Sequence, residues 1–117
     1  MKKSITILED DEDIRDICMY VFSDAGYTVS GFGSVGDFMA VPHPTDLFLL
    51  DVRLPDGSGI EVCKWLKQHH MYHHIPIILM SAHLDIAAMR ELSQADGFMA
   101  KPFRLEQLLE QTAQLLP

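Results

Sequence analysis

The chain has 117 residues, of which 48% are hydrophobic and 22% charged, a composition typical of one globular domain and not of an intrinsically disordered tail. Its formal net charge is −8 and its nine basic residues are scattered, which argues against a nucleic-acid-binding surface, because phosphate binding needs clustered lysine and arginine. No apolar run approaches the roughly 20 residues of a membrane span and no signal-peptide pattern opens the chain, so we expect a cytoplasmic protein.

The first part of the chain predicts a strand, a helix and a second strand. Residues 4–9 form an apolar run that ends in acid, which indicates a strand. Over residues 14–25, apolar residues recur at helical spacing after an acidic stretch that suits the positive end of a helix dipole, and Gly26 is placed to cap this helix. Residues 27–30 alternate, as an edge strand with one solvated face would.

A short helix and a central strand follow. Ser34 can cap a helix of about two turns, because two nearby prolines limit its length. Residues 47–50 are four large apolar side chains in a row, which indicates a strand buried on both faces, since a half-exposed strand would alternate. Asp51 ends this strand, because the proline and glycines after it are typical of a loop.

The second half predicts two further strands that alternate with helices. The elements expected there are, in order, a helix around residues 62–66, a strand over 77–80, a helix around 86–92, a strand over 98–100 and a helix over 105–116. Ser81 ends the first of these strands and Lys101 the second.

Strands that alternate with helices predict an α/β protein with a single doubly wound parallel sheet, here of five strands with five helices. The carboxyl ends of parallel strands share one edge of the sheet, where open α/β folds place their sites. The residues at these strand ends are Glu9, Asp10, Asp51, Ser81 and Lys101. The pattern therefore predicts three carboxylates, a hydroxyl and an ammonium at one edge.

Four motifs, in this order and each at a strand end, resemble the receiver domain of two-component response regulators. They are Leu8-Glu9-Asp10-Asp11, Leu49-Leu50-Asp51-Val52-Arg53-Leu54-Pro55 followed by Gly57 and Gly59, Met80-Ser81-Ala82, and Ala100-Lys101-Pro102-Phe103. The resemblance covers the whole chain, so it implies one receiver domain over residues 1–117, with a flavodoxin-like fold and the strand order 2-1-3-4-5. It also implies that Asp51 accepts a phosphoryl group from a histidine kinase or a histidine phosphotransfer domain.

The three acids predict a magnesium site. Grouping Glu9, Asp10 and Asp51 is unfavourable by itself, because like charges about 4 Å apart cost on the order of 4 kcal/mol at an effective dielectric constant near 20. A hard divalent cation removes this cost, and Mg²⁺ prefers carboxylate, phosphate and water oxygens. We therefore expect Asp10 and Asp51 as direct ligands and Glu9 as a ligand through water. The resemblance adds the backbone carbonyl of Arg53.

Phosphoryl transfer needs alignment and neutralised phosphoryl oxygens, for which we expect Mg²⁺, Lys101 and the Ser81 hydroxyl. The resemblance implies a cis peptide bond between Lys101 and Pro102. It further implies a switch in which Ser81 moves toward the phosphoryl group and Phe98 turns inward, stabilising the face formed by the fourth helix, the fifth strand and the fifth helix. That face would contact an output domain or protein, or a second copy of the chain, and the domain itself would not bind nucleic acid.

Two other functions compete with the phosphoacceptor switch. A haloacid-dehalogenase-like phosphatase also uses an aspartate after a buried strand, but it needs a second aspartate two residues later, where this chain has Arg53. A non-phosphorylated receiver-like interaction module would not need the complete set of acids, serine and lysine. We therefore expect self-directed phosphotransfer and slow autodephosphorylation, without turnover of an outside substrate. The side chains of Arg53 and His83 either tune that hydrolysis or only lie exposed in their loops.

Two further groups of residues invite a metal or redox interpretation. The stretch His69-His70-Met71-Tyr72-His73-His74 lies at the opposite edge of the sheet from Asp51, so we expect a solvated loop, with adventitious metal binding as the alternative. Cys18 and Cys63 lack metal-ligand spacing and are typical of buried cysteines rather than of a disulfide.

Overall fold

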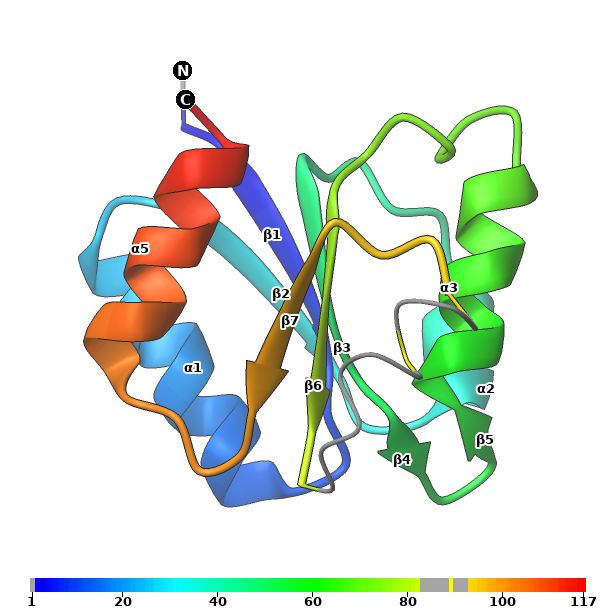
Figure 1. Cartoon of the computed structure of the whole chain (residues 1–117), viewed down its shortest axis with the longest axis horizontal. Helices are drawn as coiled ribbons and strands as arrows, with labels where there is room; N and C mark the ends of the chain where they lie inside the picture. Colours follow the sequence, from blue (N-terminus) through cyan, green and yellow to red (C-terminus); the bar gives the residue numbers. More distant parts are fainter. Residues whose placement is uncertain (1, 83–88, 90–92) are drawn as a thin grey trace.

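Helices and strands alternate along the chain as the sequence predicts (Figure 1). The structure, a computed structural model, describes residues 2–82, 89 and 93–117. In chain order the elements are β1 (Ser4–Leu8), α1 (Glu12–Asp24), β2 (Thr28–Phe32), α2 (Val35–Met39), β3 (Leu47–Asp51), β4 (Arg53–Leu54), β5 (Gly57–Ser58), α3 (Gly59–Gln68), β6 (Ile77–Ser81), β7 (Gly97–Ala100) and α5 (Leu105–Leu115).

Five of the strands form one parallel sheet in the order β2-β1-β3-β6-β7. With β6 and β7 as its fourth and fifth strands, this sheet confirms the predicted order 2-1-3-4-5. Helices α1 and α5 cover one face of the sheet, and α2 and α3 cover the other (Figure 1). The chain therefore has the doubly wound, flavodoxin-like α/β fold.

Two stretches differ from the prediction, and a third predicted element lies almost entirely outside the described residues. β2 extends to Phe32 rather than ending at residue 30, because its backbone stays paired with β1 as far as Leu8. The stretch after β3, which was expected to be only a loop, contains the antiparallel pair β4–β5. Four of the five predicted helices are described, whereas the helix expected around 86–92 lies outside the described residues except for Met89, which is buried.

The central strands are buried on both faces. In β3, Leu47 and Leu49 pack beneath α1 and α5, whereas Phe48 and Leu50 pack beneath α2 and α3. The neighbouring strand β6 alternates in the same way, and every residue of both strands is buried. This double burial explains why both strands are continuous apolar runs in the sequence.

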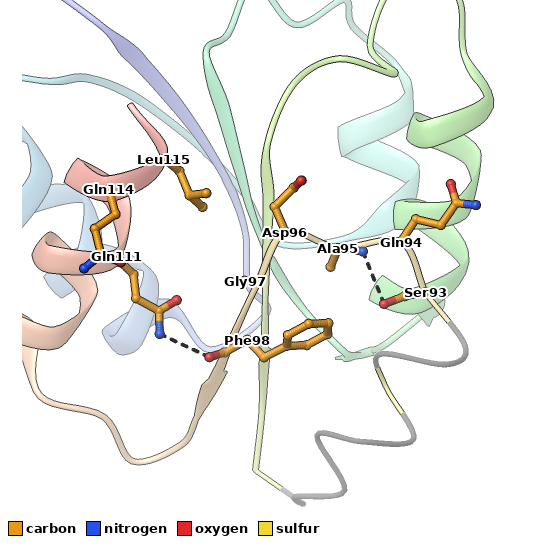
Figure 2. Close-up of a pocket in the computed structure, with 9 residues that line it drawn as sticks. All are labelled: Ser93, Gln94, Ala95, Asp96, Gly97, Phe98, Gln111, Gln114 and Leu115. Atoms are coloured by element: carbon orange, nitrogen blue, oxygen red, sulfur yellow. Dashed lines mark hydrogen bonds between the residues drawn. The ribbon is translucent and has the colours of Figure 1, made fainter. Parts of the chain in front are cut away.

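Helix α5 covers one face of the sheet and also reaches its edge strand, β7. Leu108 and Thr112 are fully buried on the helix. The side chain of Gln111 extends to the edge, where its Nε2 donates a hydrogen bond to the carbonyl oxygen of Phe98 at 3.2 Å (Figure 2). This contact occupies a backbone group that an edge strand would otherwise present to solvent.

Two hydrogen bonds and a close approach of backbone atoms hold the turn from β3 into α3. The Gly59 N–H donates to the carbonyl oxygen of Val52 at 2.9 Å, and the Ser58 hydroxyl accepts from the Ile60 N–H at 3.2 Å as the N-cap of α3. A Cβ atom at Gly59 would lie 2.0 Å from the carbonyl oxygen of Asp51. The backbones of β3 and α3 therefore approach too closely for any side chain at this position.

Gly59→Ala should destabilise the fold by about 3 kcal/mol, because the added methyl group meets backbone atoms that cannot rotate away. The free energy of unfolding in urea measures this cost. As the control, Gly36→Ala adds the same methyl group where the nearest atom is a carboxylate oxygen of Asp56 at 3.3 Å, and it should cost about 1 kcal/mol or less. Equal losses for the two variants would contradict the close approach at Gly59.

His43 is a buried imidazole in the connection between α2 and β3. Its ring stacks on Phe38 with the centroids 4.2 Å apart, and its Nε2 donates to the carbonyl oxygen of Phe38 at 2.7 Å. Its backbone N–H donates to the Tyr72 hydroxyl at 3.1 Å. Burial lowers the pKa of His43 below its ordinary 6.5, although the hydrogen bond to Phe38 acts in the opposite direction.

This lowered pKa predicts a loss of stability in mild acid. Below pH 6.5 the unfolded chain takes up a proton on His43 that the folded chain resists, so the contribution of His43 to the free energy of unfolding falls as the pH falls. His43→Phe keeps an aromatic ring but removes the titrating group, so its urea midpoint should fall less between about pH 7.5 and pH 5.5. His74→Gln removes an exposed imidazole instead and should keep the wild-type pH dependence. A parallel fall in the His43→Phe variant would exclude His43 as the cause.

Candidate functional site

Three carboxylates meet at the carboxyl edge of the sheet, where β1 and β3 end. One oxygen each from Glu9, Asp10 and Asp51 lies within 4.8 Å of the other two, and within the described ranges no other group of three acidic, histidine or cysteine side chains is as close. Glu9 is fully buried, Asp51 is buried and Asp10 is exposed. The three acids that the sequence predicted at one edge are thus brought together.

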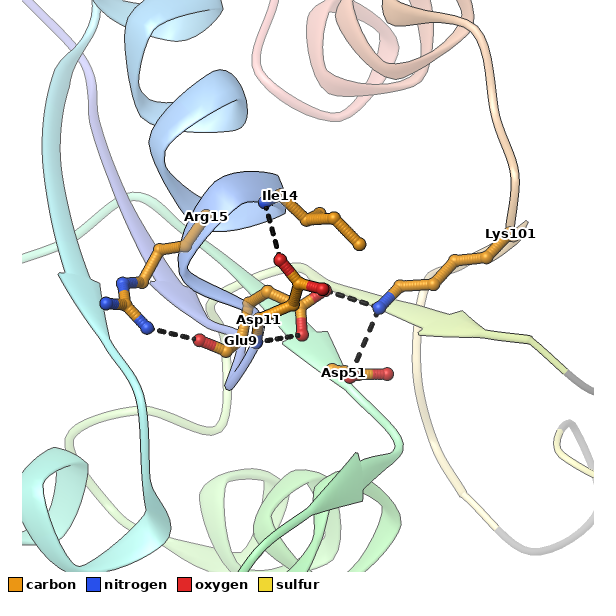
Figure 3. Close-up of polar contacts among 6 residues, drawn as sticks. All are labelled: Glu9, Asp11, Ile14, Arg15, Asp51 and Lys101. Atoms are coloured by element: carbon orange, nitrogen blue, oxygen red, sulfur yellow. Dashed lines mark hydrogen bonds and ion pairs between the residues drawn. The ribbon is translucent and has the colours of Figure 1, made fainter.

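Lys101 brings a positive charge to these acids from the end of β7 (Figure 3). Its Nζ donates to Glu9 Oε1 and lies 3.2 Å from Asp51 Oδ2. Its backbone N–H donates to the carbonyl oxygen of Ser81 at 2.8 Å, which ties the chain after β7 to the end of β6. The peptide bond from Lys101 to Pro102 is cis, as the family resemblance implied.

Burial and the neighbouring charges together shift the pKa values of two groups at this edge. The pKa of Glu9 is raised from its ordinary 4.5 to about 7, first because the carboxyl is buried and second because it hydrogen-bonds with Asp51, while Lys101 acts in the opposite direction. For Lys101, burial alone would lower the pKa, but the carboxylates of Glu9 and Asp51 outweigh burial and raise it above 10.5. One ammonium therefore offsets only part of the negative charge at this edge.

The described part of the chain contains three of the four other predicted site residues. Ser81 is buried at the end of β6, one residue beyond Met80, which is the register partner of Asp51. Arg53 is exposed on β4, two residues after Asp51. Phe98 lies on β7, half-buried against the core beneath α2 and α3. His83 lies outside the described residues.

Several contacts fix the backbone that carries the acids. The Glu9 N–H donates to the carbonyl oxygen of Phe32 at 2.9 Å, and the Asp11 N–H donates to Glu9 Oε2 at 3.3 Å. Asp11 caps α1 by accepting from the Ile14 N–H at 3.0 Å, which is the helix-start role typical of an acid at this position (Figure 3). The Arg15 guanidinium donates to the carbonyl oxygen of Glu9 at 2.8 Å.

Two residues that support the loops around the site were not predicted from the sequence. Arg15 is one, and the other is Asp56, whose carboxylate accepts from the N–H groups of Val35 and Gly36, each at 2.8 Å. These two hydrogen bonds hold the pKa of Asp56 below its usual range and tie the loop between β4 and β5 to the start of α2. The only sequence sign of the role of Arg15 is the pair Gly31 and Gly33 at the end of β2, where a Cβ atom would meet its side chain.

Among the residues that the structure describes, the histidine-rich stretch and the cysteines do not add a second site of three ligands. The His69 ring packs against Trp65 and Tyr72, with centroids 4.9 Å and 4.7 Å away, so this stretch continues the aromatic packing of α3. Cys18 and Cys63 are buried free thiols, and burial raises the pKa of each to about 11. None of the helices in the described part of the chain is long and apolar enough to cross a membrane.

Comparison with known proteins gives matches along nearly the whole chain. The family model of the response regulator receiver domain matches residues 5–113. The chain is 34% identical over 119 residues to the transcriptional regulatory protein GltR of Pseudomonas aeruginosa, covering 97% of this chain and 49% of GltR. It is 32% identical over 116 residues to the polar-differentiation response regulator DivK of Brucella ovis, covering 94% of this chain and 93% of DivK. The chain thus spans about half of GltR and nearly all of DivK.

Solved structures agree with these matches. The BeF3-activated receiver domain of DrrB superposes with a TM-score of 0.89 at 28% identity, over 99% of this chain and 98% of that domain. A CheY-like response regulator receiver domain protein from Methanospirillum hungatei superposes with a TM-score of 0.88 at 26% identity, over 99% of this chain and 94% of that one. Sequence matches, structural matches and strand order agree, and the chain belongs to the response regulator receiver domain family.

Proposed function

We propose that residues 1–117 form one receiver domain that accepts a phosphoryl group on Asp51 from a histidine kinase or a histidine phosphotransfer domain, in the cytoplasm. The observation that carries this proposal is the cluster of Glu9, Asp10 and Asp51 against the Lys101 ammonium at one edge of the sheet. The domain would transfer phosphoryl groups only to itself and release them slowly by hydrolysis, without turnover of an outside substrate.

The donor atoms at this edge fit Mg²⁺. All three clustered side chains offer carboxylate oxygens, the ligands that this ion prefers, and one lysine leaves much of their charge unbalanced. Asp10 and Asp51 would bind the ion directly, Glu9 would bind it through water, and Arg53 would contribute its backbone carbonyl. When bound, the ion would neutralise charge on the phosphoryl oxygens.

The chain's own residues then supply the nucleophile and its alignment. A carboxylate oxygen of Asp51 attacks phosphorus, so that a bond from oxygen to phosphorus forms while the bond from the donor imidazole to phosphorus breaks. The Lys101 ammonium, 3.2 Å from Asp51 Oδ2, is close enough to stabilise the added charge. Ser81, at the end of the neighbouring strand, would hold another phosphoryl oxygen and move toward it after transfer.

An apolar groove beside the acceptor supports docking of a donor domain. The groove has a volume of about 460 Å³, and it is lined by Ile14 and Ile17 of α1, by Phe103 and Leu105, and by Lys101 itself. Ile17 is 50% exposed and Leu105 is 37% exposed, so both present apolar area to solvent at this groove. A partner that places a phosphohistidine over Asp51 would cover this groove and bury its apolar surface.

The proposed output surface would include β7 and α5. A polar pocket of about 550 Å³ is lined by Asp96 and Phe98 near β7 and by Gln111 and Gln114 of α5 (Figure 2). Because Phe98 and Lys101 belong to the same short stretch, a shift of Phe98 after phosphorylation would change this surface directly. The surface would control an output domain or protein, and size-exclusion chromatography with and without beryllofluoride and Mg²⁺ distinguishes such a partner from a second copy of the chain.

Asp51→Asn should abolish labelling of the chain by radioactive acetyl phosphate in the presence of Mg²⁺, because an amide cannot form the acyl phosphate. Asp24→Asn, at an exposed position at the far end of α1, should be labelled like the wild type. Labelling that persists in Asp51→Asn would identify another acceptor. Turnover of p-nitrophenyl phosphate by the wild type would instead favour the phosphatase alternative.

Phe98→Ala should leave the labelling of Asp51 intact and weaken the response of the output surface, since the side chain lies on β7 and outside the cluster of acids. Hydrogen exchange of the α5 amides with and without beryllofluoride and Mg²⁺ measures that response. Tyr20→Ala removes an aromatic side chain that is 72% exposed on α1 and should respond like the wild type. An unchanged response in Phe98→Ala would exclude the aromatic switch.

A further inference from the structure

The side chain of Arg15 crosses from α1 to the end of β1. Its Nη1 donates a hydrogen bond to the carbonyl oxygen of Glu9 at 2.8 Å (Figure 3). That carbonyl belongs to the peptide unit that joins Glu9 to Asp10, so Arg15 acts on the backbone between two of the clustered acids. On its other side, the Glu9 N–H donates to the carbonyl oxygen of Phe32. The Glu9 backbone is therefore held by α1 and by β2 at once.

Two glycines at the end of β2 leave the space that Arg15 occupies. A Cβ atom at Gly33 would lie 2.9 Å from Arg15 Nη1. One at Gly31 would lie 3.2 Å from Arg15 Cδ and 2.6 Å from Met19 Sδ. Neither glycine has a positive φ, so the backbone conformation does not require glycine at either position. What requires glycine there is the path of the side chains of α1 over the end of the strand.

The orientation of the Glu9–Asp10 peptide unit decides where the Asp10 carboxylate points. Asp10 is exposed, so little packing holds its side chain, and the backbone that carries it decides where its carboxylate points. A hydrogen bond from a guanidinium is charge-assisted and stronger than one between neutral groups, and arginine keeps its charge throughout the accessible pH range. Arg15 is thus suited to hold the Glu9–Asp10 peptide in one orientation.

We propose that Arg15 is a positioning residue for the divalent-cation site, which it serves by fixing the peptide unit that directs Glu9 and Asp10 toward Asp51. This inference rests on the proposed function, in which these carboxylates hold Mg²⁺. It extends that function to a residue that would touch neither the ion nor the phosphoryl group. Replacing residues that orient metal ligands typically weakens metal binding about 10–100-fold.

Isothermal titration calorimetry with Mg²⁺ tests the proposal without any phosphoryl donor. Arg15→Ala should raise the Kd for Mg²⁺ about tenfold, because the peptide unit loses the hydrogen bond from α1. Arg15→Lys keeps a positively charged donor and should recover part of the affinity. Arg104→Ala removes the same charge from an exposed position and should bind Mg²⁺ like the wild type.

Gly33→Ala disturbs the same contact from the opposite side and removes no charge. Among the described residues, its Cβ would meet only the guanidinium of Arg15 within 4 Å, which is the far end of a flexible side chain, so the urea midpoint should stay close to that of the wild type. Because the guanidinium must move away, Mg²⁺ affinity should fall as it does in Arg15→Ala. In the Arg15→Ala background, Gly33→Ala should then have no further effect, whereas additive losses would overturn the proposal.

Stability and affinity together separate positioning from a purely structural role. If Arg15→Ala lowers the urea midpoint and leaves the Kd for Mg²⁺ unchanged, Arg15 only ties α1 to the sheet and the inference fails. Absence of Mg²⁺ binding by the wild-type chain would overturn the proposed function and this inference with it. Normal binding by the wild type together with unchanged binding by Arg15→Ala overturns only the inference.

Discussion

The ion pairs of the Lys101 ammonium with Glu9 and Asp51 are the contacts on which the site depends. They join the ends of β1, β3 and β7, and Glu9 and Lys101 are 92 positions apart in the sequence. A fully buried carboxylate such as that of Glu9 is costly unless a charged or hydrogen-bonding partner faces it. Since one lysine cannot balance three acids, the same arrangement that stabilises Glu9 leaves this edge of the sheet attractive to a divalent cation.

Contacts to backbone groups fix the loops that carry the charged residues of the site. Gly59 packs against the carbonyl of Asp51, Asp56 ties the following loop to α2, and Arg15 reaches the carbonyl of Glu9. Each contact acts on a residue at or next to a strand end, where the regular hydrogen bonds of the sheet stop. The buried strands supply a rigid base, and these few contacts carry its rigidity into the loops that bear the functional groups.

Two different surfaces adjoin the cluster of acids through the end of β7. The apolar groove against α1 includes Lys101, and the polar pocket against α5 includes Phe98, three residues earlier in the chain. Their chemistry differs, because the lining of the groove is mainly apolar, whereas the lining of the pocket offers amides and an acid. Under the proposed function, the short stretch from Phe98 to Lys101 would be the connection through which a change at Asp51 reaches the output surface.

The sequence by itself determined the fold class, the strand order through the family resemblance, and the acids, serine and lysine at the strand ends. It could do so because continuous apolar runs mark buried parallel strands, and such strands place their last residues at one edge. It did not predict the extension of β2, the β4–β5 pair, or the roles of Arg15 and Asp56. Those depend on contacts between segments distant in the chain, such as the pairing of Phe32 with Leu8 and the reach of Asp56 to Val35. Only the tertiary structure brings these segments together, because a local pattern carries no information about which distant backbone group a side chain meets.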